Sequence, residues 1–141
     1  MLRVEPEIKA AYVASGRVSL AFHPMLDHGD ASRWSQRAAE CAGAQDPLQF
    51  WTLHDLLFER QSQLLRAGEA GMVDFAAEIG LDTDAFRACM ADPAISAKIE
   101  RMDQARRNAG IRRRPSFHIN GRLLEGAVPF AGFTQAFADA E

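Results

Sequence analysis

Two cysteines, Cys41 and Cys89, are the thiols with which this chain could do redox chemistry, and it has no others. They lie far apart, and neither belongs to a Cys-x-x-Cys pair, so adjacent-thiol chemistry is absent from the chain as given. The residues themselves leave two interpretations open. The cysteines are either reduced and buried as small apolar side chains, or joined in a structural disulfide that would stabilise the fold by about 4 kcal/mol.

The segment RRRPSFHING, residues 112 to 121, combines charge, a proline and a turn signal. Pro115 has no N–H to donate and a fixed φ, and three arginines precede it directly. Asn120-Gly121 is a dipeptide typical of two-residue hairpin turns. The pattern therefore predicts strands over 115–119 and 122–125.

Other polar residues were weighed as sites. Four of them, His23, Asp27, His28 and Asp30, fall close together as metal ligands do. They have no cysteine partner and lie in a predicted loop, so no metal is expected there. His54 lies one position from an apolar helical stripe, which favours a structural histidine over a catalytic base. No Gly-rich phosphate loop or Ser-His-Asp ordering stands out, and no cofactor is expected.

Charge is unevenly distributed along the chain, although its net value is only −3. Seven basic residues and two acidic ones fall between Lys98 and Arg114. A binding module for nucleic acid or for an acidic protein surface is therefore the competing class of function. No aromatic residue is interleaved with these arginines to stack on bases, so nucleic acid is not expected as a partner. No apolar run reaches the ~18 residues of a membrane span, and no signal peptide is visible.

Periodicity predicts mostly helices, with one strand near the start and a hairpin near the end. Val18, Leu20 and Phe22 alternate with polar or small residues, which predicts a strand over 17–23. Asp82 or Thr83 is the predicted N-cap of one helix, and Gly43 the predicted end of another. The predicted helices cover 6–15, 31–43, 49–65, 70–79, the stretch after residue 82, 93–110 and 128–140. This order describes a small α/β layer with an all-helical insertion.

Three segments carry a resemblance to a known family: AAECAGAQ…FWTLHDLLFERQ, GLDTDAFRACM and GIRRRPSFHINGRLLEG. They resemble the DsbA-like thiol:disulfide oxidoreductases, and the resemblance runs roughly from Pro6 to the end. It implies an α/β, thioredoxin-like fold, truncated at its N-terminus. Residues 1–29 and 108–141 would form the thioredoxin-like part, and residues 30–107 an inserted helical domain.

The same resemblance implies roles for individual residues. Pro115 would be a cis-proline beside the redox site, and the backbone of its neighbour Arg114 would pair with a bound polypeptide substrate. The family commonly has Thr or Val where this chain has Arg114, whose guanidinium is either a thiolate-stabilising group or a solvated surface charge. Cys41 and Cys89 would form a structural disulfide in the inserted domain, in keeping with an extracytoplasmic location.

The resemblance also defines what is missing from the chain as given. The family's Cys-x-x-Cys motif and the central strand before it would precede Met1, so no residue here is assigned a catalytic role. We therefore expect a protein related to disulfide oxidoreductases that act on cysteine-containing polypeptides, but inactive in redox chemistry as given. The alternative is a non-catalytic peptide- or protein-binding module. Exposed strand edges left by the absent strand predict a homodimer.

Overall fold

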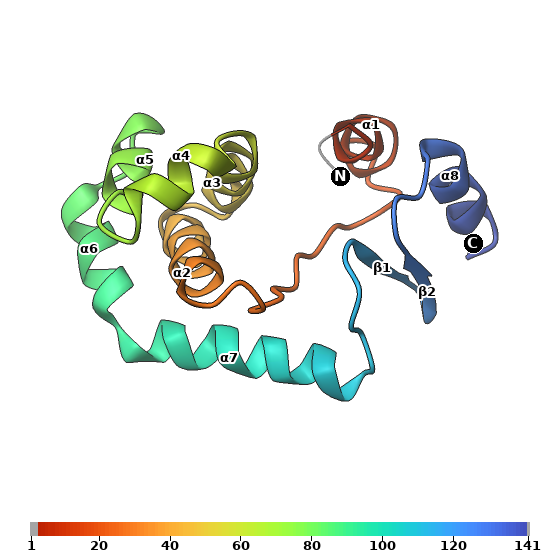
Figure 1. Ribbon diagram of the computed structural model, residues 1–141. Coiled ribbons are helices and arrows are strands. Elements are labelled where there is room, and N and C mark those ends of the chain that lie inside the picture. Colours follow the sequence, from red (N-terminus) through yellow and green to blue (C-terminus); the bar gives the residue numbers. More distant parts are fainter. Residues whose placement is uncertain (1–2, 141) are drawn as a thin grey trace. The chain divides into compact units, whose positions relative to one another are not determined.

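The structure is a computed structural model that describes residues 3–140. It divides into two compact units, shown in Figure 1. We call residues 3–22 and 107–140 the terminal unit, and residues 23–106 the helical unit. The elements of the terminal unit are α1 (Glu5–Ile8), the π-helix η1 (Lys9–Val13), β1 (Ser116–Ile119), β2 (Arg122–Glu125) and α8 (Phe130–Ala138). Those that begin in the helical unit are α2 (Asp30–Gln45), α3 (Pro47–Glu59), α4 (Gln61–Ala67), α5 (Met72–Glu78), α6 (Thr83–Ala91) and α7 (Pro93–Asn108).

The terminal unit packs a two-stranded antiparallel sheet against helices from both ends of the chain. Ile8 and Tyr12 from the first helical segment meet Phe133 and Phe137 of α8 in one buried cluster. The rings of Tyr12 and Phe137 are in edge contact, with centroids 4.7 Å apart. Phe117 of β1 adds a second edge contact, to Phe133, at 4.6 Å. Aromatic packing therefore fixes the sheet to α8.

The hairpin predicted from Asn120-Gly121 is confirmed. Asn120 has φ 43° and Gly121 has φ 93°, the paired positive values of a type I′ turn. Ile119 pairs with Arg122 and Ser116 with Glu125. Asn120 and Gly121 are therefore the two residues that connect the strands. Both residue types adopt positive φ at low cost, which is why this dipeptide specifies the turn.

The strand predicted over 17–23 is wrong. Residues 18–27 have no regular secondary structure, and the sheet of the described residues contains only β1 and β2. The alternation itself is real, because Val18, Leu20 and Phe22 are half-buried while the residues between them are exposed. An alternating pattern indicates an extended segment that buries one side against a core. A strand also needs a neighbouring strand with which to form hydrogen bonds.

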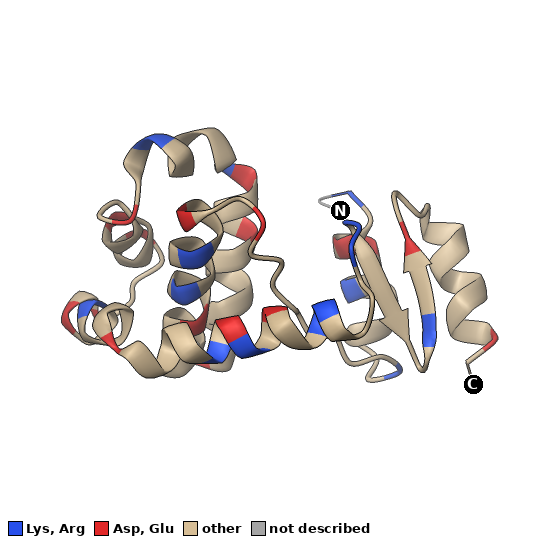
Figure 2. Cartoon of the chain, turned by 60° about the horizontal axis from the view of Figure 1, so that its bottom comes forward, with Lys and Arg blue, Asp and Glu red and all other residues tan. Residues whose placement is uncertain are grey.

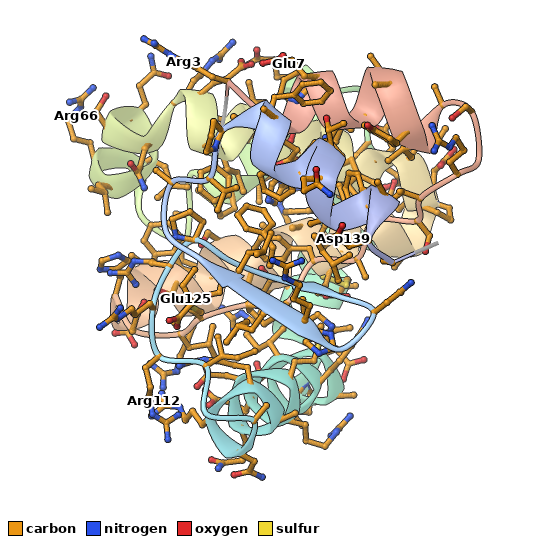
Figure 3. All side chains as sticks on the ribbon, turned by 90° about the vertical axis from the view of Figure 1, so that its right-hand side faces the viewer. Arg3, Glu7, Arg66, Arg112, Glu125 and Asp139 are labelled. Atoms are coloured by element: carbon orange, nitrogen blue, oxygen red, sulfur yellow. A yellow bond between two sulfur atoms is a disulfide. The ribbon has the colours of Figure 1, made fainter. Side chains whose placement is uncertain are left out.

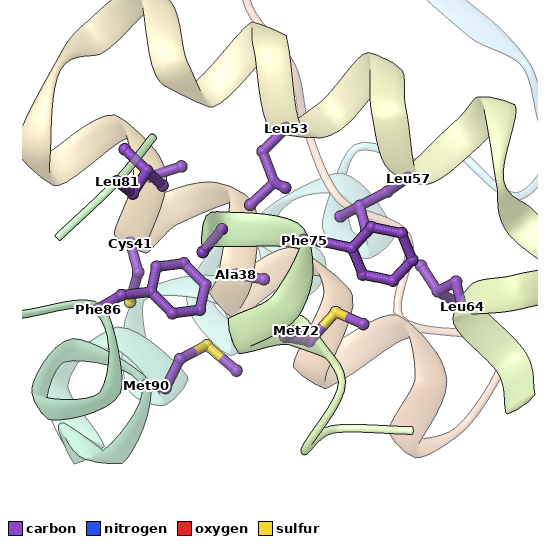
Figure 4. Close-up of a cluster of buried hydrophobic side chains, with 12 residues drawn as sticks. Ala38, Cys41, Leu53, Leu57, Leu64, Met72, Phe75, Leu81, Phe86 and Met90 are labelled. Atoms are coloured by element: carbon purple, nitrogen blue, oxygen red, sulfur yellow. The ribbon is translucent and has the colours of Figure 1, made fainter. Parts of the chain in front are cut away.

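The helical unit surrounds its own hydrophobic core, shown in Figure 4. Helices α2, α3, α5 and α6 all contribute to it. Leu53 of α3, Met72 of α5 and Phe86 of α6 are fully buried. The other buried members are Ala38, Cys41, Ala42, Leu57, Leu64, Phe75, Ala76, Leu81 and Met90. Burial of so many apolar side chains gives this unit a core of its own.

Two helix boundaries differ from the prediction. Gly43 does not end its helix: α2 continues to Gln45, and a Cβ at position 43 would lie 3.0 Å from the Phe50 Cβ. Gly43 therefore serves close packing of α2 on α3 rather than capping. The predicted helix over 49–65 is broken at Arg60, which has φ −108° and ψ 32°. The Arg60 guanidinium makes two 2.6 Å bonds to Glu78 of α5 at this break.

The predicted start of α6 is confirmed, with Asp82 as the N-cap. Its Oδ1 accepts hydrogen bonds from the N–H groups of Asp84 (2.9 Å) and Ala85 (3.0 Å). We expect Asp82→Ala to lower the free energy of unfolding by about 1 kcal/mol, because two N–H groups lose their acceptor. Urea unfolding measures the change. Asp84→Ala, which removes a neighbouring exposed carboxylate but no cap, is the matched control and should change it by less than about half as much.

The buried carboxylate of Asp103 links the two ends of the helical unit. Asp103 of α7 is 3% exposed and Arg106 is 7% exposed. The Asp103 Oδ1 accepts hydrogen bonds from Arg106 Nε at 2.8 Å and Nη2 at 2.6 Å. The same oxygen accepts the N–H of Leu26, from the loop before α2, at 3.0 Å. Asp103 thus holds the loop that enters the unit against the helix that leaves it.

Candidate functional site

Pro115 stands at the entrance to β1, and the Arg114–Pro115 peptide bond is cis. The carbonyl of Pro115 accepts the N–H of Gly126 at 2.8 Å, so the pairing of the hairpin extends one position beyond β1 and β2. Ser116 turns its Oγ back to the carbonyl of Arg113, at 2.6 Å. Pro115 is half-buried, whereas the three arginines before it are exposed.

The two faces of β1 carry different side chains, and its outer side, the edge opposite β2, carries backbone groups. Phe117 and Ile119 are half-buried and pack on the core of the terminal unit, and His118 is exposed between them, as the alternation predicts. Backbone groups of Pro115 and Phe117 point towards β2, because the register places them in hydrogen-bonded pairs. Those of Ser116 and His118 therefore point to the other side of β1, where no strand of the described residues pairs.

The end of α8 is tied to β2 by a small polar network. Arg122 donates to Asp139 Oδ2 at 2.8 Å, and Gln135 donates to Asp139 Oδ1 at 2.6 Å. These bonds, first the one from Gln135 and then the one from Arg122, lower the pKa of Asp139 below its ordinary value. Because β2 pairs with β1, this network also holds the strand that Pro115 precedes.

The lowered pKa of Asp139 predicts a pH dependence. The folded chain binds the Asp139 proton less tightly than the unfolded chain, so the network stabilises the protein above the unfolded pKa. That stabilisation is lost as pH falls through the folded pKa. Gln135→Ala should therefore raise the pKa of Asp139, as measured by carboxyl NMR titration. Other carboxyl titrations should stay unchanged, and an unchanged Asp139 titration would contradict the assignment.

Cys41 and Cys89 are joined in a disulfide that links α2 to α6, with Cα atoms 5.7 Å apart. Of the two interpretations that the residues left open, the structure therefore has the disulfide. Cys41 is fully buried and Cys89 is half-buried against the same core. Both thiols of the chain are thus committed to one bond inside the helical unit.

His54 is enclosed by its own helix and by aromatic side chains. His54 is 5% exposed, its Nδ1 lies 2.9 Å from Asp55 Oδ1, and its ring contacts Phe50 and Phe58. This is the setting expected of a structural histidine. The four residues weighed as metal ligands, His23, Asp27, His28 and Asp30, are not brought together as a cluster of ligand atoms among residues 3–140.

Acidic and basic residues alternate along α7, as Figure 2 shows. Lys98 pairs with Glu40 of α2, and Arg106 is buried against Asp103, so the basic stretch is partly neutralised. The bond between Arg33 of α2 and Glu100 of α7 raises the pKa of the Arg33 guanidinium. The pairing of Asp103 with Arg106 was not foreseen from the sequence. Its only signal is an i, i+3 spacing that exposed pairs share.

Residues 2–139 match the family described as Thioredoxin. Among curated proteins, the chain is 34% identical to the Na(+)/H(+) antiporter NhaA of Herminiimonas arsenicoxydans over 102 residues, 72% of this chain and 16% of that protein. It is 31% identical to Na(+)/H(+) antiporter NhaA 1 of Salinispora arenicola over 119 residues, 82% of this chain and 18% of that protein. It is 22% identical to disulfide bond formation protein D of Bacillus subtilis over 130 residues, 89% of this chain and 58% of that protein.

The chain therefore spans less than a quarter of the antiporters and 58% of the disulfide bond formation protein. No solved structure matches it. Within the described residues, no helix has the length and apolar character needed to cross a membrane.

Proposed function

Because the chain belongs to the thioredoxin family, we propose that it binds extended polypeptides in the manner of the thiol:disulfide oxidoreductases that it resembles. In this proposal, residues 1–141 supply the polypeptide-binding surface and perform no thiol chemistry by themselves. Arg114 and Pro115 form the substrate-binding position. The helical unit is the insertion that the resemblance implies. Ion transport is not part of the proposal, because the matched segment is only 16% and 18% of the two antiporters.

The commitment of both cysteines to one disulfide carries the proposal. Thiol:disulfide exchange begins with attack by a thiolate, and this chain has no third cysteine to supply one. Cys41 is inaccessible in the core, so an incoming thiol would reach only the half-buried Cys89. The disulfide therefore has the surroundings of a structural cross-link.

Two assays test the redox part. We expect the purified protein to accelerate neither the reduction of insulin by dithiothreitol nor the oxidation of a dithiol peptide. The variant Cys41→Ala/Cys89→Ala, which has no sulfur to exchange, should give the same background rates. Turnover by the wild-type chain that this variant lacks would refute redox inactivity.

The binding part is tested by site-specific photo-crosslinking. A benzophenone side chain at His118, exposed at β1 near Pro115, should capture an unfolded, carboxymethylated polypeptide. The same group at Thr134, exposed on α8, is the matched control and should capture much less. Equal capture at the two positions would mean that no binding surface is localised at β1.

We also propose that the chain forms a homodimer through the outer side of β2. Leu123 on this strand is 41% exposed, and no second strand pairs there among the described residues. An unpaired edge with an exposed apolar side chain favours pairing with another edge. Light scattering during size-exclusion chromatography should give twice the 15.5 kDa chain mass, and Leu123→Lys should give the chain mass. A monomer at micromolar wild-type concentration would reject this assembly.

A further inference from the structure

The turn of the hairpin places an asparagine directly before a glycine at an exposed position. Asn120 and Gly121 are both exposed, and a Cβ added at Gly121 would meet no atom within 4 Å. The Asn120 Nδ2 lies 3.5 Å from the carbonyl oxygen of Ala140, a long and weak hydrogen bond. The register gives the bonds that close the turn to Ile119 and Arg122, so the N–H of Gly121 stands outside the ladder. The carboxamide and the nitrogen after it are therefore both open to water.

These two groups can react with each other. The Gly121 nitrogen, once its proton is lost to a hydroxide ion, can attack Cγ of the Asn120 carboxamide. The new N–C bond closes a succinimide ring, and the carboxamide nitrogen leaves Cγ as ammonia. Water then opens the ring at either of its carbonyls. The product is aspartate or isoaspartate, in which the main chain runs through the side-chain carbons. In sum, the chain gains water and loses ammonia, and nothing is oxidised or reduced.

The residue after Asn120 and the short strands around it both favour this reaction. Glycine has no side chain to shield its nitrogen, and its backbone rotates more freely than that of any other residue. The ring fixes the backbone at Asn120, so the turn has to open as the ring forms. The flanking strands, β1 and β2, have four residues each, and so short a pair of strands opens easily at its tip. The reaction therefore needs local opening of the turn rather than unfolding of the terminal unit.

We propose that Asn120 is a site of spontaneous modification, converted in the folded protein through a succinimide with Gly121 to aspartate and isoaspartate. This inference concerns the chemistry of the chain itself and does not depend on polypeptide binding. Isoaspartate adds a carbon atom to the main chain of a two-residue turn. The type I′ conformation and the strand register that it sets are therefore lost when isoaspartate forms.

The tip of the hairpin is also where β2 is tied to the end of α8. Figure 3 labels Asp139 on this end of α8 and Glu125 at the other end of β2. Arg122, which follows the turn directly, donates to Asp139 Oδ2 at 2.8 Å. A longer main chain at Asn120 moves Arg122 away from this position. Formation of isoaspartate should therefore release the end of α8 from β2.

Ageing of the purified protein, followed by peptide mass spectrometry, tests the proposal. The folded protein is held in mildly alkaline buffer, and the tryptic peptide that ends at Arg122 is weighed over time. Asn108, which precedes Ala109, is the other asparagine of the chain and serves as the internal control. Asn120 should acquire the mass change of deamidation at least about fivefold faster than Asn108. An isoaspartyl methyltransferase should label the aged peptide, because this enzyme methylates isoaspartate and not aspartate.

Asn120→Gly is the matched variant. Glycine also accepts the positive φ of this turn position, but it has no carboxamide to react. In the aged wild type, carboxyl NMR titration should show a rise in the pKa of Asp139. Bonds from Gln135 and from Arg122 lower this pKa, and isoaspartate formation removes the second. The aged variant should keep the Asp139 titration of the fresh protein.

Each remaining outcome counts against the proposal. Equal rates at Asn120 and Asn108 in the folded protein would overturn it. Conversion of Asn120 only in protein unfolded by urea would also overturn it, because the hairpin would then protect the site. Deamidation without methyl labelling would show that the ring opens to aspartate alone, and the lengthened turn would be refuted. An unchanged Asp139 titration at high isoaspartate content would refute the release of α8.

Discussion

Replacement of both Cys41 and Cys89 by alanine is expected to lower the free energy of unfolding by about 4 kcal/mol. The disulfide closes a loop with a sequence separation of 48 residues, so its loss enlarges the set of conformations open to the unfolded chain. The bond joins α2 to α6, and both helices contribute to the core of the helical unit. The effect should therefore be concentrated in that unit. Urea unfolding followed by circular dichroism measures it.

Alanine rather than serine is the suitable replacement, because Cys41 is fully buried and a hydroxyl there would add a buried polar group. Wild-type protein unfolded in excess dithiothreitol is the internal control, since it loses the same cross-link without a change of side chain. The variant and the reduced wild type should unfold at similar urea concentrations. An oxidised wild type that is no more stable than the variant would show that the cross-link adds nothing to folding.

Replacement of Asp103 by asparagine is expected to cost about 3 kcal/mol or more. The neutral amide leaves the guanidinium of Arg106 buried at 7% exposure without its counter-charge. One Asp103 oxygen also accepts the N–H of Leu26, so the loop before α2 depends on the same group. Equilibrium unfolding in urea gives the size of the loss.

The chain contains a well-matched control for this pair. Asp84 and Arg87 on α6 have the same residue types at the same i, i+3 spacing, but their side chains are 94% and 58% exposed. Asp84→Asn should therefore cost less than about 1 kcal/mol. Asp103→Leu/Arg106→Leu, which removes both charges, should be less destabilising than Asp103→Asn alone. Equal costs at positions 84 and 103 would contradict the importance of burial.

The sequence predicted elements well where local chemistry alone decides the conformation. Asn120-Gly121 specifies a type I′ turn through its backbone preferences, and Asp82 caps α6 with its own side chain. The family was also recognisable, because its three sequence segments keep their spacing along nearly the whole chain. Neither kind of information depends on a partner elsewhere in the fold.

Predictions failed where the conformation depends on residues that are distant in the sequence. The pattern over 17–23 has the alternation of a strand, but the described chain pairs no strand with it. Gly43 has the sequence signature of a helix end, but it lies inside α2, where a side chain would crowd Phe50. In the candidate site, the sequence indicated Arg114 and Pro115 through resemblance. The backbone N–H and C=O groups of Ser116 and His118 point away from β2. This direction follows from the register of the hairpin, which is known only from the three-dimensional pairing of the strands.

The bond between Leu26 and Asp103 has a consequence for the order in which the chain folds. The terminal unit is built from both ends of the chain, so its formation must close a loop of ~80 residues. Once the helical unit has formed, Asp103 holds Leu26 beside α7, and only ~8 residues separate the two pieces of the terminal unit. This shorter path reduces the loop-closure entropy by about 2 kcal/mol. The helical unit should therefore fold first and bring together the two pieces from which the terminal unit is made.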